Sequence, residues 1–249
     1  MNKILPALVL LFCACTDNPV AYTDVATPKL VTRSNDTAVF ERGIRAWPEA
    51  AYNTNGGIRI EWYSLEDVGG FSVYRTDMTD SASGLPVGFE RIAKFRIGET
   101  DEDTAYVDTL IERNRRYFYS VRAFDRSVRE LEGSSSDTAD FLMEDPIRLI
   151  NPGQSVEFGQ PVNFRWTGSP GYSVIRVYEV VNKVSETIGR PVWVYGANIA
   201  SFSDPNFVYD ADNRALPLIK GNKYRWRITR VSPGKSRGAA SPWRSFTVE

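Results

Sequence analysis

The chain has 249 residues, which is enough for one large domain or for two modules of about 100 residues each. Its 30 basic and 31 acidic residues give a net charge of −1, so no overall field attracts a nucleic acid, and we expect no nucleic-acid partner. Histidine, the commonest general base and metal ligand near neutral pH, is absent. Most hydrolase triads and zinc sites are therefore excluded.

The N-terminus has the pattern of an export signal. Lys3 precedes an apolar run over residues 4–12, which is too short to span a membrane. Residues 11–15 (Leu-Phe-Cys-Ala-Cys) resemble a bacterial lipobox, in which a small residue precedes an acylated cysteine, although Phe12 stands where leucine is usual. The resemblance implies that Cys15 carries a lipid anchor, and an ordinary cleaved signal peptide is the alternative.

On the lipoprotein reading, residues 1–14 are the signal peptide. Thr16 follows the acylated cysteine where an inner-membrane retention signal would have aspartate, which favours a lipid-anchored localisation in the cell envelope, at the outer membrane. Proline and small residues without a sustained period then indicate that residues 15–37 form a lipidated N-terminus and flexible tether. Because both cysteines lie in the first fifteen residues, the folded part has no disulfide.

The rest of the chain predicts an all-β fold with an internal repeat. Short alternating runs bounded by Gly, Pro, Asn and Asp recur, whereas no stretch keeps the helical spacing over three turns. Three strand motifs recur 104 to 107 residues further on, at the pairs Trp62 and Trp166, Val73 and Val177, and Tyr117 and Tyr224. In these three successive strands, apolar residues alternate in the same way in both halves of the chain, and an aromatic residue recurs at the same place. This indicates a duplicated module.

Each copy resembles the fibronectin type III family. The family's late motif, Leu-x-Pro-Gly-x-x-Tyr-x-Val-x-Val-x-Ala, is similar to residues 218–228 and to residues 111–123, where Asn114 takes the glycine position. The resemblance implies two tandem antiparallel β-sandwich domains, at 38–145 and 146–249, with an immunoglobulin-like relative as the alternative for the second. It also implies that Tyr117 and Tyr224 hydrogen-bond back to the backbone before their strands. Strand assignment between residues 180 and 215 stays open.

Several polar motifs invite a catalytic or metal-binding interpretation. Ser232 and Lys235 have the Ser-x-x-Lys spacing of some acyl-transfer enzymes, but proline and glycine between them oppose the helix that such a site needs. Residues 99–103 and 210–213 gather carboxylates of the kind that bind calcium, without the glycine and distal glutamate of a calcium loop. We therefore expect no catalytic residues, no metal and no cofactor, with solvated acidic loops as the simplest interpretation.

Alternation along the strands predicts which side chains face outward. If Tyr117 points inward, Phe118 and Phe124 point outward, and Tyr74 does so on the neighbouring strand. The first module then carries an aromatic patch.

The same parity in the second module predicts a basic and aromatic face. With Tyr224 and alternate residues inward, the outward side chains are Arg225 and Arg227, beside Arg176 and Tyr178 on the neighbouring strand. Trp193 and Tyr195, on the strand whose assignment stays open, are candidates to extend this face. Cross-strand stacking alone would explain such residues, and a docking face for protein or glycan is the functional interpretation.

These observations favour a non-catalytic envelope lipoprotein that acts as a protein-interaction or scaffold module. Its expected partner is an envelope protein or a glycan, and it contacts the membrane through its lipid anchor. The alternative is a carbohydrate-binding lipoprotein that serves glycan capture or uptake.

Overall fold

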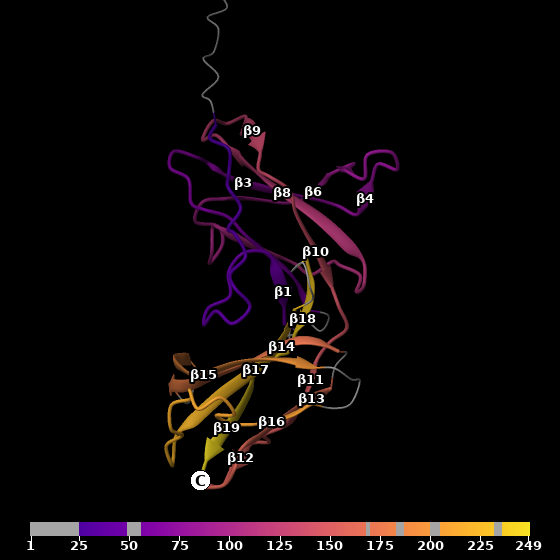
Figure 1. The fold of residues 1–249 in the computed structure, drawn as a ribbon. Coiled ribbons are helices and arrows are strands. Elements are labelled where there is room, and N and C mark those ends of the chain that lie inside the picture. Colours follow the sequence, from indigo (N-terminus) through magenta and orange to yellow (C-terminus); the bar gives the residue numbers. More distant parts are fainter. Residues whose placement is uncertain (1–24, 49–55, 168–169, 183–186, 200–204, 232–235) are drawn as a thin grey trace, which may run out of the picture.

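The computed structural model describes residues 25–48, 56–167, 170–182, 187–199, 205–231 and 236–249. In these ranges every regular element is a strand, and no helix is long and apolar enough to cross a membrane. Two β-sandwich modules stack end to end (Figure 1). The predicted fold class is confirmed, whereas the predictions for residues 1–14, Cys15, and the Ser232 and Lys235 pair lie outside the described residues.

Module 1 is a small sheet packed on one half of a large sheet. The small sheet has the order β1 (Arg45–Trp47), β2 (Gly57–Glu61), β7 (Ala105–Asp108). The large sheet contributes β6 (Glu90–Arg96), β3 (Gly70–Thr76) and β8 (Arg116–Phe124), with β9 (Glu132–Ser135) and β10 (Ala139–Met143) both paired to β8. A short hairpin of β4 (Met78–Thr79) and β5 (Pro86–Val87) projects from the sandwich (Figure 1).

Module 2 repeats this arrangement. Its small sheet has the order β11 (Arg148–Asn151), β13 (Asn163–Thr167), β16 (Asn206–Val208). The facing strands are β15 (Thr187–Ile199), β14 (Gly171–Asn182), β17 (Lys223–Val231), β18 (Arg237–Ala240) and β19 (Arg244–Val248), and β12 (Ser155–Val156) pairs with β19 in parallel. The long hairpin of β14 and β15 settles the open assignment between residues 180 and 215 in the described ranges.

Alternating apolar residues fill the two cores as the sequence predicts. Trp62 and Trp166 are each 2% exposed, one in each core cluster. The hydroxyl of Tyr117 accepts a hydrogen bond from the Glu112 amide, and that of Tyr224 from the Ile219 amide, each at 2.9 Å. Both tyrosines therefore hold the turn before their strands, as the resemblance implies.

A repeated serine interrupts the last strand of each module. Ser136 separates β9 from β10, and its hydroxyl accepts from the amide of Val121 at 2.9 Å. Ser241 separates β18 from β19 and accepts from the amide of Ile228 at 3.0 Å. Each serine satisfies a buried donor of the neighbouring strand where the backbone ladder is broken. This match extends the repeat beyond the motifs found in the sequence.

The modules are joined through one continuous sheet. β10 pairs with β18 in parallel, so the last strand of module 1 lies beside the next-to-last strand of module 2, and together the two modules build an 11-stranded sheet. The amide of Leu142 donates to the Ser236 carbonyl at 2.9 Å, and that of Glu144 to the Gly238 carbonyl at 2.8 Å. Ala240 of module 2 packs into the core of module 1. The two units therefore meet at a packed junction.

The structure corrects the predicted tether. The sequence predicts that residues 25–37 belong to it, but Leu30 forms a bridge with Trp62, and the Val31 amide donates to the Glu61 carbonyl at 2.9 Å. Val25 and Leu30 pack against the core of module 1. Isolated apolar residues without a period indicate a flexible chain, but in the structure these residues form an added edge of the sandwich. Module 1 therefore begins before residue 38.

Candidate functional site

The most connected polar site lies at the junction, where residues 35–41, here called the strap, leave module 1 and cross to module 2. The neck of the strap is closed by Ser34 and Arg42, whose backbone and side-chain atoms exchange hydrogen bonds at 3.1 and 3.2 Å. Gly43 follows with φ +75°, and a Cβ there would lie 2.6 Å from the Val31 carbonyl oxygen. Glycine is therefore required where the chain turns back into module 1.

Arg176 of β14 is the anchor of the strap on module 2. It is 1% exposed, and its Nε donates to the Ala38 carbonyl at 3.1 Å. Its terminal nitrogens donate to the Asp36 carbonyl and, at 3.1 Å, to the Thr229 hydroxyl. A buried guanidinium is stable only when its donors are paired, and the strap backbone supplies the pairing here.

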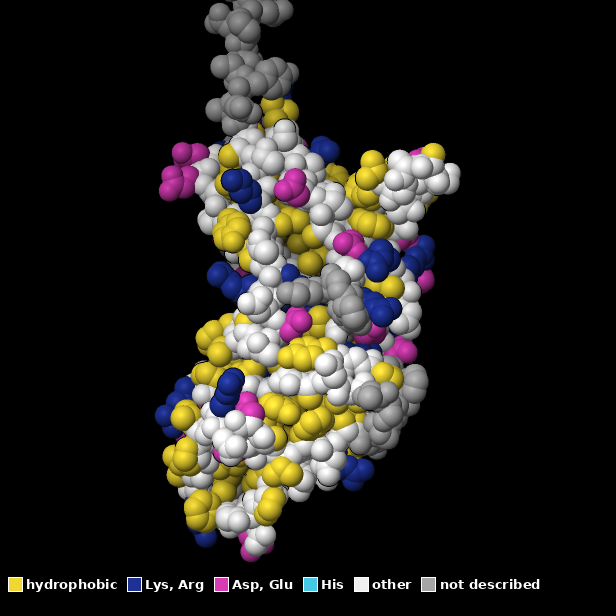
Figure 2. Space-filling view, viewed as in Figure 1, with side chains coloured by type: hydrophobic (Ala, Val, Ile, Leu, Met, Phe, Trp, Pro, Cys, Tyr) yellow, Lys and Arg dark blue, Asp and Glu magenta, His cyan; other side chains and the backbone are white. Residues whose placement is uncertain are grey.

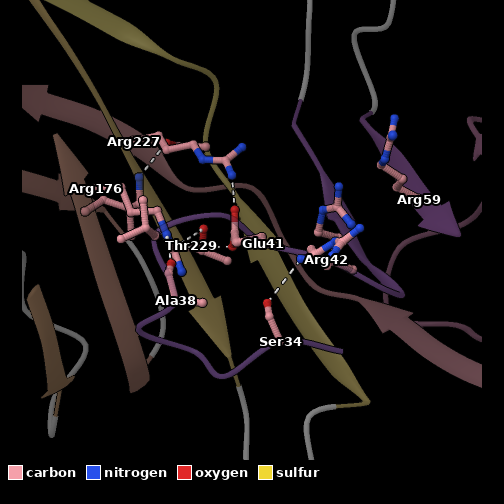
Figure 3. A network of polar contacts seen from close by, with 12 residues as sticks. Ser34, Ala38, Glu41, Arg42, Arg59, Arg176, Arg227 and Thr229 are labelled. Carbon is pink, nitrogen blue, oxygen red and sulfur yellow. Dashed lines mark hydrogen bonds and ion pairs between the residues drawn. The ribbon is translucent and has the colours of Figure 1, made fainter. Parts of the chain in front are cut away.

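Glu41 completes the pairing between two arginines (Figure 3). One of its oxygens lies 3.2 Å from Arg176, and the other forms a hydrogen-bonded ion pair with Arg227 on the neighbouring strand β17. Burial lowers the pKa of both guanidinium groups to about 10, which leaves both charged at neutral pH. The single carboxylate thus sits between two buried cations that register opposite each other.

Aromatic rings cover the remaining part of this face. Trp243 lies under the guanidinium groups of Arg225 and Arg227, at 5.5 and 4.7 Å from its ring centroid. Tyr178 meets the same ring edge-on at 5.5 Å, and its hydroxyl donates to the Val39 carbonyl of the strap. Cation–π contacts therefore keep the arginine side chains aligned beside the strap.

A second ion pair closes the opposite side of the junction. Glu144, just after β10, lies 2.8 Å from Arg230 of β17 and 3.6 Å from Arg237 of β18. The Arg230 side chain is 4% exposed and also donates to the Asp145 carbonyl at 3.3 Å. Module 1 thus contributes a carboxylate on each side of the junction, and module 2 contributes the arginines.

This geometry corrects the predicted binding face of module 2. Arg176, Tyr178, Arg225 and Arg227 do share one sheet face, as parity requires, but the strap covers it: Arg176 is 1% and Tyr178 4% exposed. Parity assigns a face to a side chain and does not reveal whether a distant segment covers that face.

The predicted extension of the face is also wrong. Trp193 is 2% exposed, packs against Phe164 in the core of module 2, and donates through its indole nitrogen to Asp212 at 2.9 Å. Tyr195 stacks on it at 5.2 Å and packs against the same core. Trp193 registers with Val177 and Tyr195 with Ile175, whose side chains lie in the core, so both rings face inward. This cross-strand register cannot be obtained from alternation along a single strand.

The predicted aromatic patch of module 1 is likewise built into a polar network. Phe124 is 1% exposed and lies under the Lys94 ammonium at 4.6 Å, whereas Phe118 and Tyr74 are half-buried. Tyr74 donates to Glu132 of β9, and the same carboxylate accepts from the Ser72 hydroxyl at 2.6 Å. These contacts occupy the patch from within the module.

In the acidic loops, carboxylates accept hydrogen bonds from backbone amides of the same loop. Asp103 accepts from the Gly98 amide at 2.9 Å, and Asp210 from the Ala215 amide at 2.8 Å. Within the described ranges, no three acidic side chains gather in an arrangement that would hold a metal ion. Their carboxylates act as turn caps at these positions.

The residue that organises the junction, Glu41, was missed by sequence reasoning. It directly follows the short apolar run of residues 38–40, and its arginine partners are more than 130 residues away. Trp243 was missed for a similar reason, since it follows the strand break at Ser241. An acidic residue at the end of a short apolar run was the available signal.

Comparison with known proteins finds similarity only to solved structures, and that similarity is low. No family model matches the chain, and no curated protein does so. Among solved structures, an Fn3-like protein from Clostridium thermocellum is 20% identical with a TM-score of 0.31, covering 47% of this chain and 92% of that one. A two-domain fibronectin type III segment of chicken tenascin is 11% identical with a TM-score of 0.28, covering 88% of this chain and 96% of that one.

A β-1,2-glucanase from Parabacteroides distasonis is 19% identical with a TM-score of 0.32, and the match covers 49% of this chain and 13% of the glucanase. All of these TM-scores are below 0.5. The assignment of two β-sandwiches therefore rests on the strand order and registers of the chain itself: a three-stranded sheet packed on a larger sheet, twice over.

Proposed function

We propose that the chain is a non-catalytic scaffold of the bacterial cell envelope, anchored by lipid at Cys15, which holds its second module in a fixed orientation away from the membrane. The observation that carries the proposal is the junction, where a continuous sheet and two sets of ion pairs join the modules. Interfaces between domains of one chain usually permit relative motion unless they are large and well packed. A strap that crosses the joint favours a rigid unit.

The charges at the junction suit a structural role. Glu41 forms ion pairs with both Arg176 and Arg227, and Glu144 forms one with Arg230. Each arginine is oriented by a carbonyl, a hydroxyl or an aromatic ring of the chain itself. Charged groups that are paired with one another in this way fix the relative position of the strands that carry them.

The direction of the molecule follows from its two ends. Residue 25 lies against Gly133 of β9, at the outer end of module 1, whereas the C-terminus lies at the outer end of module 2 (Figure 1). An anchor at Cys15 therefore places module 1 next to the membrane. The outer end of module 2 is then the part of the chain that reaches furthest toward other envelope components.

The glycan-capture alternative loses its main support. It depended on a basic and aromatic face in module 2, and the strap covers that face. We therefore favour interaction with a protein.

Membrane fractionation tests the anchor. Cys15→Ser should release the chain from the membrane fraction, whereas Cys13→Ser, the matched control, should leave it there. Retention of Cys15→Ser in the membrane would contradict the lipid anchor.

A capture experiment tests the scaffold role. The tagged full-length chain, cross-linked in solubilised envelopes, should retain a protein partner, and the double variant Glu41→Gln with Glu144→Gln should retain less because its modules no longer keep one orientation. Glu132→Gln, which removes a carboxylate that faces away from the junction, is the matched control. Equal capture by the loosened variant would show that orientation does not matter.

A further inference from the structure

A cleft opens at the outer end of module 2. It has a volume of about 540 Å³. One wall is formed by residues 156–162 and the other by residues 208–210 and 215–218, and Val248 also lines the cleft. This is the end that the proposed anchor places furthest from the membrane, so an inference about the cleft rests on the proposed function. Figure 2 shows yellow hydrophobic side chains continuing down to this end of the molecule.

Hydrogen bonds within the chain fix both walls of the cleft in the absence of a partner. In the first wall, the Glu249 amide donates to the Val156 carbonyl at 2.9 Å, and the Phe158 amide donates to the Glu249 carbonyl at 2.7 Å. In the second wall, Tyr209 donates its hydroxyl to the Leu216 carbonyl at 2.6 Å. The Leu216 amide in turn donates to the Val192 carbonyl of β15 at 2.8 Å. A preformed cleft binds at a lower entropic cost than one that must first be ordered.

The second wall is an addition of module 2. Residues 209–222 connect β16 to β17, whereas residues 109–115 make the same connection between β7 and β8 in module 1. The corner tyrosine keeps its place at the end of both loops, so the extra residues lie between the strand β16 and that corner. They form the wall that carries Leu216.

Large apolar side chains stand in solvent around the cleft. Phe158 is 53%, Val208 46% and Leu216 41% exposed. Apolar side chains that gather at a concave site commonly mark a binding surface, because covering them removes apolar area from water. Aliphatic side chains form much of this lining, which favours an apolar occupant over a sugar.

The charged residues that line the cleft are Glu157 and Asp210, both acidic. Glu157 is exposed, and Asp210 uses one oxygen to cap the Ala215 amide. This sign excludes an acidic ligand and favours a cationic group beside the apolar contact. We propose that the cleft binds an apolar segment of another envelope protein that carries lysine or arginine next to its apolar side chains.

A second copy of the chain fits less well. Its loop between β8 and β9 has suitable chemistry, since Val128 is fully exposed between Arg126 and Arg129. That loop lies at the β9 end of module 1, which the proposed anchor keeps beside the membrane. The exposed hairpin of β4 and β5 carries Asp80, whose charge has the same sign as the cleft. Self-association is therefore an outcome that the test must exclude.

Selection from a displayed library of random twelve-residue peptides on the detergent-solubilised full chain tests the proposal. We expect the selected peptides to share apolar residues beside lysine or arginine. Labelled copies of them should bind at least tenfold more weakly to Phe158→Ser, and to the double variant Glu157→Gln with Asp210→Asn. Leu110→Ser, at an 82% exposed position of module 1, is the matched control and should bind like the parent chain.

Three results would overturn the proposal: no shared motif, an acidic motif, or selected peptides that bind the cleft variants as tightly as the parent chain. Sedimentation that shows the full chain binding itself through Phe158 would replace the partner by a second copy and would overturn it too. The scaffold proposal is tested separately, because neither membrane release of Cys15→Ser nor capture by the loosened junction variant depends on which peptides are selected.

Discussion

The outer faces of the two large-sheet halves occupy equivalent positions, and they are covered in different ways. In module 1, Glu132 comes from β9 of the same module and contacts Ser72, Tyr74 and, at 3.9 Å, Arg122. In module 2, the covering carboxylate is Glu41, which comes from the strap, a segment that leaves module 1 and returns to it. The outer face of the sheet is thus covered by a neighbouring strand in module 1 and by a segment distant in sequence in module 2.

This difference explains why the polar network on the face of module 1 stabilises that module alone, whereas the network on the face of module 2 joins the two modules. The Glu132 network is held within one sandwich, and its arginines Arg91 and Arg122 are half or nearly half exposed. The Glu41 network is buried, because the Arg176 side chain is 1% and the Arg227 side chain 12% exposed. Buried pairs are sensitive to loss of a partner, and exposed pairs are not.

The largest expected effect tests whether the two cores are equivalent. Trp62→Ala and Trp166→Ala should each cost about 3–5 kcal/mol of unfolding free energy, because both rings fill cores where they are 2% exposed. Chemical denaturation followed by tyrosine and tryptophan fluorescence measures the loss. A loss below about 1 kcal/mol for one of them would show that its core tolerates the cavity and that the modules are not equivalent.

The next prediction compares the two carboxylates, Glu41 and Glu132, that cover the sheet faces of module 2 and module 1. Glu41→Gln should cost roughly 3 kcal/mol, because it leaves the buried Arg176 and Arg227 without their carboxylate. Glu132→Gln, the matched change in module 1, should cost less than about 1 kcal/mol, because its arginine partners are solvated. Thermal unfolding of both variants makes the comparison, and equal losses would contradict the distinction between a buried and an exposed cover.

A pH effect follows from Glu61, which anchors the chain just after the strap. Burial opposes its ionisation, but hydrogen bonds from Arg45 and Arg59 lower its pKa to about 2 in the folded chain. Its ionised form therefore stabilises the fold fully above about pH 4.5, and this contribution is lost as the pH falls toward 2. Glu61→Gln should reduce stability by roughly 1–2 kcal/mol at pH 7, and the difference should shrink through that window. A pH-independent difference would exclude titration of Glu61 as its source.

The smallest effect concerns the repeated serines. Ser136→Ala and Ser241→Ala should each cost about 1 kcal/mol, because each leaves a strand amide, that of Val121 or Ile228, without its side-chain acceptor. Similar losses at both positions would support a duplicated strand break. Hydrogen exchange at the two amides provides a direct check, since both should exchange faster in the matching variant.

Local pattern in the sequence was sufficient for the fold of each module. Alternation placed Tyr119 and Trp226 inward, and the corner motif placed the hydroxyls of Tyr117 and Tyr224 on the backbone. These features depend on neighbours along one strand or turn. Phe124 was placed on the correct face, but its burial under Lys94 depends on a side chain from another strand.

The junction was beyond such reasoning. Arg176 reads as an outward arginine from its strand alone, and its burial follows from carbonyls at Asp36 and Ala38, about 140 residues earlier. The strap has no period that would indicate a regular element. Its order comes from pairing with module 2, which a local pattern does not encode.

The rigid junction is tested most directly by distance measurement between the modules. Spin labels at Leu110→Cys in module 1 and Val181→Cys in module 2, both exposed, with Cys13 and Cys15 replaced by serine, report the separation by electron–electron double resonance. The full chain should give one narrow distance distribution, and Glu41→Gln with Glu144→Gln should broaden it. A broad distribution in the chain with both glutamates intact would contradict a scaffold whose modules are locked by the strap.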